Sequence, residues 1–463
     1  MRRGAIASLT LTLALGVTLA LGATAAVASA ARASKLPRCP IGALKTAKKP
    51  VEIVMWHQLT GGNDAVLQSI ADRFNASQHD VHVTLVQFPD TAFVKFISGL
   101  KTGDLPDVIA IEETTIQPMI DTGATLPVQS CVDASRYSLK DFIPRPIAAY
   151  TTQGVLRSMP FNVSGAVLYY SKTMFQKAGL DPNRPPRSLA DVEAYSKKIV
   201  AAGVAPHGIA MHREPFYNEF FYAKSGQTYV NNGNGRKSRA TKATLSNATG
   251  RKIWSWWKRM TDSGLALDTG TAPTNFDHLF AVANGKAAMT ITGSAATGPI
   301  FAALNAGQYP AVVPGVGPMP GLDPRGGVEV GEGSLWMSNR SSAAKQAAAW
   351  RWIQYLVSTP TLVDLDARTG YTPIRRSVVN DPRIQALWKE HPEYRVPYDQ
   401  LVNGPTNAAT SGAVIGPFPE VRTAVQEGLT EMIDGHKSAA TALADTQKKV
   451  DSLIADYNSR VAG

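Results

Sequence analysis

Two hydrophobic periodicities alternate near the N-terminus, and their order predicts strands joined by helices. Three runs are short and either apolar or alternating, as strands are: 51–55, 80–88 and 107–111. Two segments with apolar residues at helical spacing separate them: 64–77 and 92–102. Strands connected in this way form a parallel sheet, and ligands bind beyond the carboxyl ends of its strands. Those ends carry Trp56-His57-Gln58 and Glu112-Glu113-Thr114-Thr115.

The same pattern starts again near residue 132 and predicts a second α/β unit. Strands are expected at 167–170 and 287–292, and Ser188 followed by Asp191 is typical of a capped helix start. The expected helices span 172–178, 249–263, 343–356 and 439–457. The polar segment 231–239 is expected to be a flexible loop.

The first thirty residues have the pattern of a secretory signal peptide. Arg2 and Arg3 precede an uncharged apolar run, and Ala28-Ser29-Ala30 is typical of a cleavage site. We therefore expect a signal peptide over 1–30, then an N-terminal tail over 31–49; an uncleaved anchor is the alternative. The protein should work in the periplasm or at the outer face of the cytoplasmic membrane.

The two cysteines fit an exported protein. Cys39 and Cys131 are too few for a tetrathiolate zinc site, and outside the cytoplasm they are expected to form a disulfide. Two free thiols are the alternative. Pro37-Arg38 precedes Cys39 where a lipid-modified cysteine would need small residues.

The remaining chemistry argues against an enzyme and against nucleic-acid binding. The formal net charge of the 463 residues is +11, but the basic residues are scattered. Neither a nucleophile elbow, nor a zinc-protease motif, nor a phosphate-binding loop occurs in the sequence. His79 and His82 have a metal-ligand spacing, but they open an exposed strand and are expected to be solvated. We expect neither a metal nor a cofactor.

Several motifs resemble one family, the extracellular solute-binding proteins of ATP-driven importers. The run Met159-Pro160-Phe161-Asn162-Val163-Ser164 continues through Leu168-Tyr169-Tyr170-Ser171-Lys172 to Phe175-Gln176-Lys177-Ala178-Gly179-Leu180-Asp181-Pro182. Trp56-His57, Gly285–Thr290, Gly331–Trp336 and Thr369–Ile374 follow in the family's order, so the resemblance covers about 50–460. The chain is most similar to the branch that binds sn-glycerol 3-phosphate.

This resemblance implies a two-lobed α/β fold of the type II periplasmic-binding-protein kind, with the ligand between lobes that close about a hinge. The first lobe is expected to take 50–130 plus 300–358, and the second 131–299 plus 359–463. The expected function is capture of a glycerol-3-phosphate-like or glycerophosphodiester ligand by a monomer that delivers it to a membrane permease. A sugar or oligosaccharide is the alternative ligand. A secreted hydrolase and a surface adhesion protein are weaker alternatives.

The family's binding residues can be carried over one position at a time. Trp56 would cover the apolar face of a polyol beside His57, Glu113 would accept from hydroxyls, and Tyr371 would meet a phosphate. Trp56 and Tyr371 are expected to line the cleft from opposite lobes. Serines and glycines of the motifs would hydrogen-bond the ligand or let backbone amides approach it: Ser164, Ser294, Gly331 and Gly333. Phe216 would belong to an aromatic wall in the second lobe. Simple packing is the alternative for Trp56, and an ordinary turn or cap is the alternative for each serine.

One position departs from the family pattern and puts the ligand in question. Val414 stands where the branch has an arginine, and Glu332 adds a charge between two glycines. A phosphate without that arginine loses a charge-assisted pair. Either Arg375 or Arg213 replaces it, or the ligand is a sugar, a polyol or a glycerophosphodiester with a cationic head.

Overall fold

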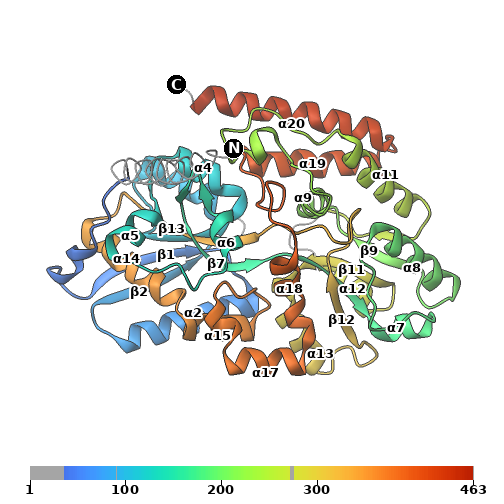
Figure 1. Cartoon of the computed structure of the whole chain (residues 1–463), viewed down its shortest axis with the longest axis horizontal. Helices are drawn as coiled ribbons and strands as arrows, with labels where there is room; N and C mark the ends of the chain where they lie inside the picture. The colour runs from blue at the N-terminus through green and yellow to red at the C-terminus, as the bar shows by residue number, and fades with distance from the viewer. Residues whose placement is uncertain (1–35, 90, 272–275, 462–463) are drawn as a thin grey trace, which may run out of the picture.

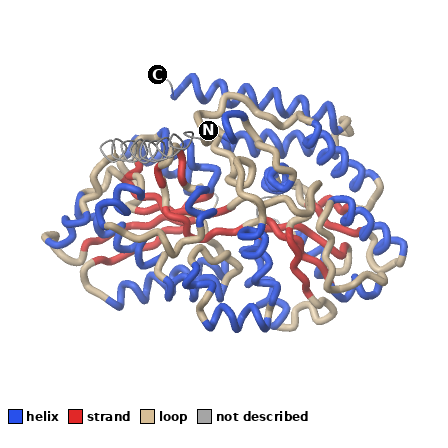
Figure 2. The backbone as a smooth tube through the Cα atoms, in the orientation of Figure 1, coloured by secondary structure: helices blue, strands red, loops and turns tan. Residues whose placement is uncertain are grey.

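Two β-sheets, each covered by helices, form the two lobes of this computed structural model (Figure 1). The structure describes residues 36–89, 91–271 and 276–461, so the expected signal peptide lies outside the described residues. Strands occupy the interior of each half and helices the outside, as Figure 2 shows. Within the described residues, no helix combines the length and the apolar character that crossing a bilayer requires.

The first sheet begins as the parallel sheet that the sequence predicts. Its strands are β1 (Val51–His57), β2 (Val81–Gln87), β3 (Val108–Glu112), β4 (Thr125–Leu126), β7 (Met159–Ser164) and β13 (Gly331–Ser338). The order is β2-β1-β3-β13-β4, with β7 paired to β13. β1 pairs in parallel with β2 and β3, whereas β13 comes from far along the chain and runs antiparallel to β3.

The second sheet has the order β10-β9-β11-β8-β12. Its strands are β8 (Ala166–Ser171), β9 (His207–Met211), β10 (Ala266–Asp268), β11 (Ala287–Gly293) and β12 (Pro314–Pro318). β9 pairs in parallel with β10 and β11, while β8 runs antiparallel to β11 and β12. A separate hairpin pairs β5 (Thr151–Thr152) with β6 (Val155–Leu156).

Helices of the first lobe pack around the first sheet. They are η1 (Ile41–Lys45), α2 (Gly61–Ser77), α3 (Ala92–Thr102), η2 (Glu113–Thr115), α4 (Ile116–Asp121), α5 (Val128–Ser135), α6 (Pro144–Ala149), α14 (Ala343–Leu356), α15 (Thr359–Arg368), α16 (Arg376–Val379) and α17 (Pro382–Glu390). η4 (Pro392–Arg395) and α18 (Val396–Asn403) follow and reach β12 of the second sheet.

Helices of the second lobe include the two that end the described chain. They are α7 (Lys172–Lys177), α8 (Leu189–Ala201), α9 (Pro215–Lys224), α10 (Asn231–Asn234), α11 (Ala248–Asp262), α12 (Asp277–Ala283), η3 (Ser294–Ala296), α13 (Thr297–Asn305), α19 (Phe418–Ile433) and α20 (Ala439–Val461). The capping box of Ser188 and Asp191 is present at α8, which confirms that prediction. Trp254 and Trp257 of α11 are fully buried in the core.

The chain passes between the lobes at places that differ from the expected boundaries. β7 belongs to the first sheet and β8 to the second, so the first crossing is at Gly165 and not near 131. Val328 packs in the second core and Val330 in the first, which places the second crossing at residue 329. β12 lies in the second sheet and α15 packs on α2, so 300–328 and 359–390 each belong to the opposite lobe from the one expected. Extended strands continue across a crossing without any change in local pattern, and this hides the boundary.

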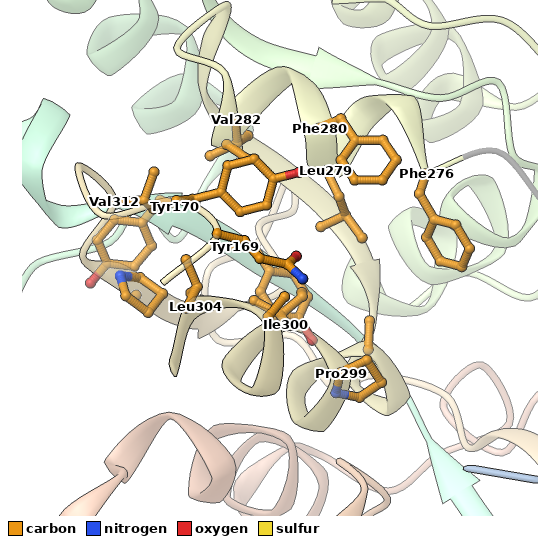
Figure 3. Close-up of a pocket in the computed structure, with 17 residues that line it drawn as sticks. Tyr169, Tyr170, Phe276, Leu279, Phe280, Val282, Pro299, Ile300, Leu304 and Val312 are labelled. Carbon is orange, nitrogen blue, oxygen red and sulfur yellow. The ribbon is translucent and has the colours of Figure 1, made fainter. Parts of the chain in front are cut away.

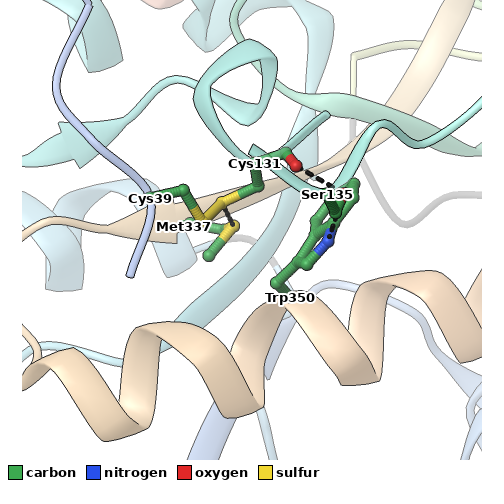
Figure 4. The surroundings of a disulfide bond; sticks show 5 residues. All are labelled: Cys39, Cys131, Ser135, Met337 and Trp350. Carbon is green, nitrogen blue, oxygen red and sulfur yellow. Dashed lines mark hydrogen bonds between the residues drawn. A yellow bond between two sulfur atoms is a disulfide. The ribbon is translucent and has the colours of Figure 1, made fainter. Parts of the chain in front are cut away.

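The predicted disulfide between Cys39 and Cys131 is present (Figure 4). It ties the segment before η1 to α5, and both cysteines are buried in the first core. The Sγ of Cys131 lies 3.8 Å from the Sδ of Met337 in β13. The cross-link therefore attaches the N-terminal segment to the centre of the first lobe.

The disulfide closes a loop of 92 residues, so its removal should destabilise the first lobe by about 2–4 kcal/mol. Denaturant unfolding of the oxidised protein and of a Cys39→Ser, Cys131→Ser double variant measures the difference. Equal unfolding free energies would contradict the expectation. Mass spectrometry of unreduced protein, showing two hydrogens fewer than after reduction, confirms that the bond is formed in the wild type.

Candidate functional site

A cavity of about 390 Å³ opens at the carboxyl ends of the first sheet's strands. Its lining comes from loops and strand ends of the first lobe: Gln58, Leu59, Pro89, Ala110, Ile111, Glu112, Asn162, Glu332, Gly333 and Tyr371. The volume is in the range of small-molecule sites, and the position is the one expected for a ligand of a parallel sheet. The expected motifs at 112–115, 331–336 and 369–374 therefore meet at one place.

A bulge in β13 aims Glu332 into this region. The register of β13 against β7 shifts between Glu332 and Ser334, and Glu332 has a φ of +68°. A non-glycine residue in this left-handed conformation is strained. Two hydrogen bonds hold it: its N–H donates to Glu113 Oε2 at 2.6 Å, and its carbonyl accepts from the hydroxyl of Tyr150 at 2.6 Å.

The Glu332 side chain connects residues that the sequence comparison selected separately. Its Oε1 accepts from the Ser164 hydroxyl at 2.6 Å, and Tyr371 also hydrogen-bonds it. Burial raises the pKa of Glu332 to about 7, and the nearby Glu113 carboxylate adds to the effect. Gly333 is needed here for close approach, because a Cβ would lie 2.0 Å from Asn162 Oδ1.

Arg422 of α19 is the cation at this interface, and it joins the two lobes. Its guanidinium donates to Glu113 of the first lobe at 2.6 Å and twice to Glu219 of α9 at 2.8 Å. The carboxylate of Glu112 lies 3.6 Å from Nη1. Glu219 is only 2% exposed, and burial raises its pKa to about 7 despite Arg422. Three carboxyl groups thus surround one guanidinium.

The second lobe brings two further expected residues next to this cluster. A Cβ on Gly331 would lie 3.1 Å from the Phe216 ring, and that ring lies 5.9 Å from the Arg422 guanidinium carbon. Ser294 is fully buried after β11, and its N–H donates to the carbonyl of Gly165 at the first crossing. Its hydroxyl has no hydrogen-bond partner among the described residues, and neither has Asn162 Oδ1.

Trp56 and His57 do not line the cavity, in contrast to the sequence expectation. Trp56 is 6% exposed in the first core, with its ring centroid 5.0 Å from that of Phe88. Tyr371 packs in the same core, so the two aromatic residues do not come from opposite lobes. His57 is also buried, which lowers its pKa, and its Nε2 lies 3.7 Å from the carboxylate of Asp64. β1 is covered on both faces at its carboxyl end, and the side chains there are enclosed.

Neither proposed substitute for the missing arginine reaches the cavity. Arg375 pairs with Asp141 and lies over the Phe142 ring, and Arg213 pairs with Asp268 and Asp434. Arg422, eight residues after Val414, ends the stretch Pro419-Glu420-Val421-Arg422, which matches the family's proline-x-x-arginine pattern, but the resemblance gave it no role in the site. The part that Arg422 plays in the site is seen only in the folded structure, from its ion pair with Glu219.

A second cavity, of about 340 Å³, lies wholly in the second lobe (Figure 3). Helices α12 and α13 and the strand residues Tyr169 and Tyr170 surround it, and its walls are almost entirely aliphatic and aromatic. None of the described residues that line it has a carboxyl group, and Gln308 is the one among them with a side-chain amide. Among the described residues, no cluster of His, Cys, Asp or Glu is suited to a metal ion.

A comparison of the sequence with known protein families identifies the family of this two-lobed protein. The sequence profile described as "Bacterial extracellular solute-binding protein" matches residues 69–395. The chain belongs to this family. Membership confirms the expectation of an exported protein, and the family comprises binding proteins.

Proteins similar to this solute-binding protein include glycerol-3-phosphate-binding and maltose-binding members. The sn-glycerol-3-phosphate-binding periplasmic protein UgpB of Yersinia pseudotuberculosis is 28% identical over 413 residues, covering 87% of this chain and 92% of the relative. UgpB from Mycobacterium tuberculosis, solved with glycerophosphocholine, superposes with a TM-score of 0.73 at 18% identity and covers 87% and 98% of the two chains. Maltose-bound MalE3 of T. maritima gives 0.72 at 19% identity, with 87% and 100% covered. The structural matches confirm the fold of two-domain binding proteins.

Because Trp56 is enclosed, Trp56→Ala should lower the unfolding free energy by about 3–5 kcal/mol. A large-to-small change there leaves a cavity between β1 and Phe88. Chemical denaturation of wild type and variant measures this loss. Unchanged stability would restore Trp56 as an exposed residue at the mouth of the site.

The raised pKa of Glu332 predicts a pH-dependent stability. The folded protein holds this proton up to about pH 7, whereas the unfolded chain releases it near the ordinary value for glutamate. The folded state therefore loses stability as the pH rises between those values. Glu332→Gln should be more stable than wild type at pH 8, by a margin that shrinks at pH 5.

Thermal unfolding at both pH values tests this prediction, with Glu420→Gln as the control. Glu420 is an exposed residue of α19. A Glu332→Gln gain of the same size at pH 5 and pH 8 would contradict the raised pKa.

Proposed function

We propose that this protein is the extracytoplasmic solute-binding component of an ABC importer that captures a glycerophosphodiester or a related glycerol-phosphate ligand. The ligand would bind at the 390 Å³ cavity, the lobes would close on it, and a membrane permease would receive it. The protein is expected to act by binding alone, without a catalytic step. The single observation that carries the proposal is the convergence on the cavity of the unpaired Asn162 amide oxygen with the carboxyl groups of Glu112 and Glu332.

Hydroxyl groups of a glycerol moiety can donate hydrogen bonds to the acceptors that line the cavity. Asn162 Oδ1 is a buried acceptor with no partner among the described residues, and the Glu332 carboxyl group lines the same cavity. Buried polar groups that lack a partner are costly, so a ligand that supplies hydroxyl donors gains affinity from filling them. Ser164 and Tyr371 already touch Glu332 and can share in its hydrogen bonds with a ligand.

The charge of the site favours a phosphodiester with a cationic head over a phosphate monoester. Arg422 is shared among Glu112, Glu113 and Glu219, so little of its charge is free for a phosphate. Val414, in the place of the branch's arginine, is buried in the first core. A dianion would meet surplus negative charge, whereas a quaternary ammonium group would be attracted by the carboxylates and by the Phe216 ring.

A sugar or oligosaccharide is the second candidate ligand. The same carboxyl and amide acceptors suit sugar hydroxyls, and the loss of the arginine does not affect a neutral ligand. Structural neighbours solved with maltose and maltotriose share this fold.

Isothermal titration with glycerophosphocholine, glycerol 3-phosphate and maltose tests the proposal. We expect glycerophosphocholine to bind at least about tenfold more tightly than glycerol 3-phosphate, since a tenfold ratio needs only 1.4 kcal/mol. Glu332→Gln should narrow this ratio by removing negative charge, and Glu420→Gln should leave it unchanged. Tighter binding of glycerol 3-phosphate would overturn the charge argument, and binding of maltose alone would establish the second candidate.

A further inference from the structure

The second lobe also contacts the first lobe outside the cavity, at Asp121, which ends α4 of the first lobe. Arg239 donates to both oxygens of this carboxylate, at 2.8 and 2.6 Å, and the Tyr457 hydroxyl of α20 donates at 2.9 Å. The Asp121 side chain is 9% exposed. A bidentate arginine–carboxylate pair fixes orientation as well as distance, so this contact sets how α4 and α20 lie relative to each other.

Arg236, which precedes Arg239 in the chain, contacts the end of α6 in the first lobe. The Arg236 guanidinium donates to the carbonyls of Ala148 at 3.3 Å, Ala149 at 3.0 Å and Thr151 at 3.4 Å, all in the first lobe. It also donates to the carbonyls of Ser411 and Gly412, in the segment between α18 and α19. The last carbonyls of a helix lack partners within the helix and favour a cation. Burial lowers the pKa of Arg236 to about 10, so it stays charged at neutral pH.

The segment 231–239 that carries both arginines is preorganised, in contrast to the flexible loop expected from its sequence. Asn234 Oδ1 accepts from the N–H groups of Tyr229 and Val230, and the N–H of Val414 donates to the Asn234 carbonyl. Gly235 has a φ of +75°, and a Cβ there would lie 1.9 Å from the carbonyl oxygen of Val414. Only glycine fits, so residues 231–239 are held against Val414, in the segment between α18 and α19.

We propose that the arrangement of the lobes in this structure is the closed one, and that residues 231–239 together with Tyr457 form an interlobe clamp that stabilises it. Neither the clamp residues nor Asp121 line the cavity. Arg239, Tyr457 and Asp121 would therefore be positioning residues: they raise the population of the closed form without touching a ligand. The free-energy cost of closing the lobes is then smaller for any ligand that binds the closed form, whatever the chemistry of that ligand.

The consequence for affinity rests on the proposed ligand capture, but the clamp itself can be tested without any ligand. Spin labels on Lys101→Cys of α3 and Lys252→Cys of α11 report the distance between the lobes by pulsed electron resonance. Both lysines are exposed, and the native cysteines are joined to each other. Distances are recorded without additive and with glycerophosphocholine, in the Arg239→Gln and Tyr457→Phe backgrounds.

Arg259→Gln is the matched control, because Arg259 pairs with Glu193 within the second lobe at 3.1 Å. We expect Arg239→Gln to move the distance distribution toward a broader, more open form, Tyr457→Phe to do so less, and Arg259→Gln to leave it as in wild type. Asp121→Asn should add little once Arg239 is replaced, because the two changes remove one interaction.

For every compound that wild type binds, Arg239→Gln should weaken binding by the same factor, about three- to tenfold. Distances in Arg239→Gln that match wild type both with and without glycerophosphocholine would overturn the clamp. A loss of affinity for one compound only would also overturn it, since that pattern belongs to a direct contact. If wild type binds none of the compounds, the proposed function fails while the distances still decide the clamp.

Discussion

The sharing of one guanidinium among carboxylates of both lobes is the constraint on which the rest of the site depends. Arg422 lies between Glu113 of the first lobe and Glu219 of the second, and Glu113 in turn holds the strained backbone of Glu332. Removing one partner of a buried ion pair leaves an uncompensated charge, which typically costs about 3–5 kcal/mol. The same contacts thus join the lobes, keep the β13 bulge in place and leave the cavity with surplus negative charge.

A different interaction, of a buried arginine with backbone carbonyls, keeps the places where the chain crosses between the lobes close together. Arg145 of α6 is buried and donates to the carbonyls of Val328, next to the second crossing, and of Leu401 and Thr410, in and after α18. Burial lowers its pKa to about 10, so it remains a cation among these oxygens. Motion of the lobes would therefore pivot about segments that are held together, while the ionic contacts of Arg422 and Arg239 form at a distance from that pivot.

Much of the fold could be predicted from the sequence because its signals are local. The strand at 107–111 and the helix at 92–102 depend on hydrophobic spacing, and α3 has the predicted bounds. The insertion of β13 beside β3 joins residues more than two hundred positions apart, and no local pattern contains it. For the same reason the lobe boundaries were wrong: the strands on both sides of Gly165 look alike in sequence.

The candidate site was predictable in part, from motifs. Glu113, Ser164 and Tyr371 do meet around Glu332, and their role toward a ligand stays a prediction. Trp56 was misjudged because an aromatic residue at a strand end is equally suited to a cleft and to a core, and only the position of Phe88 distinguishes the two. Arg422 stands in a motif that matches the family, but its role was missed because that role arises from partners on other elements.

The most direct test of the central claim is a crystal structure of the protein grown with glycerophosphocholine. The account predicts the glycerol hydroxyls within hydrogen-bond distance of Asn162 and Glu332, and the ammonium group near the carboxylates that surround Arg422. A molecule bound in the apolar cavity between α12 and α13, or a phosphate held by Arg422 with its carboxylate pairs broken, would contradict it.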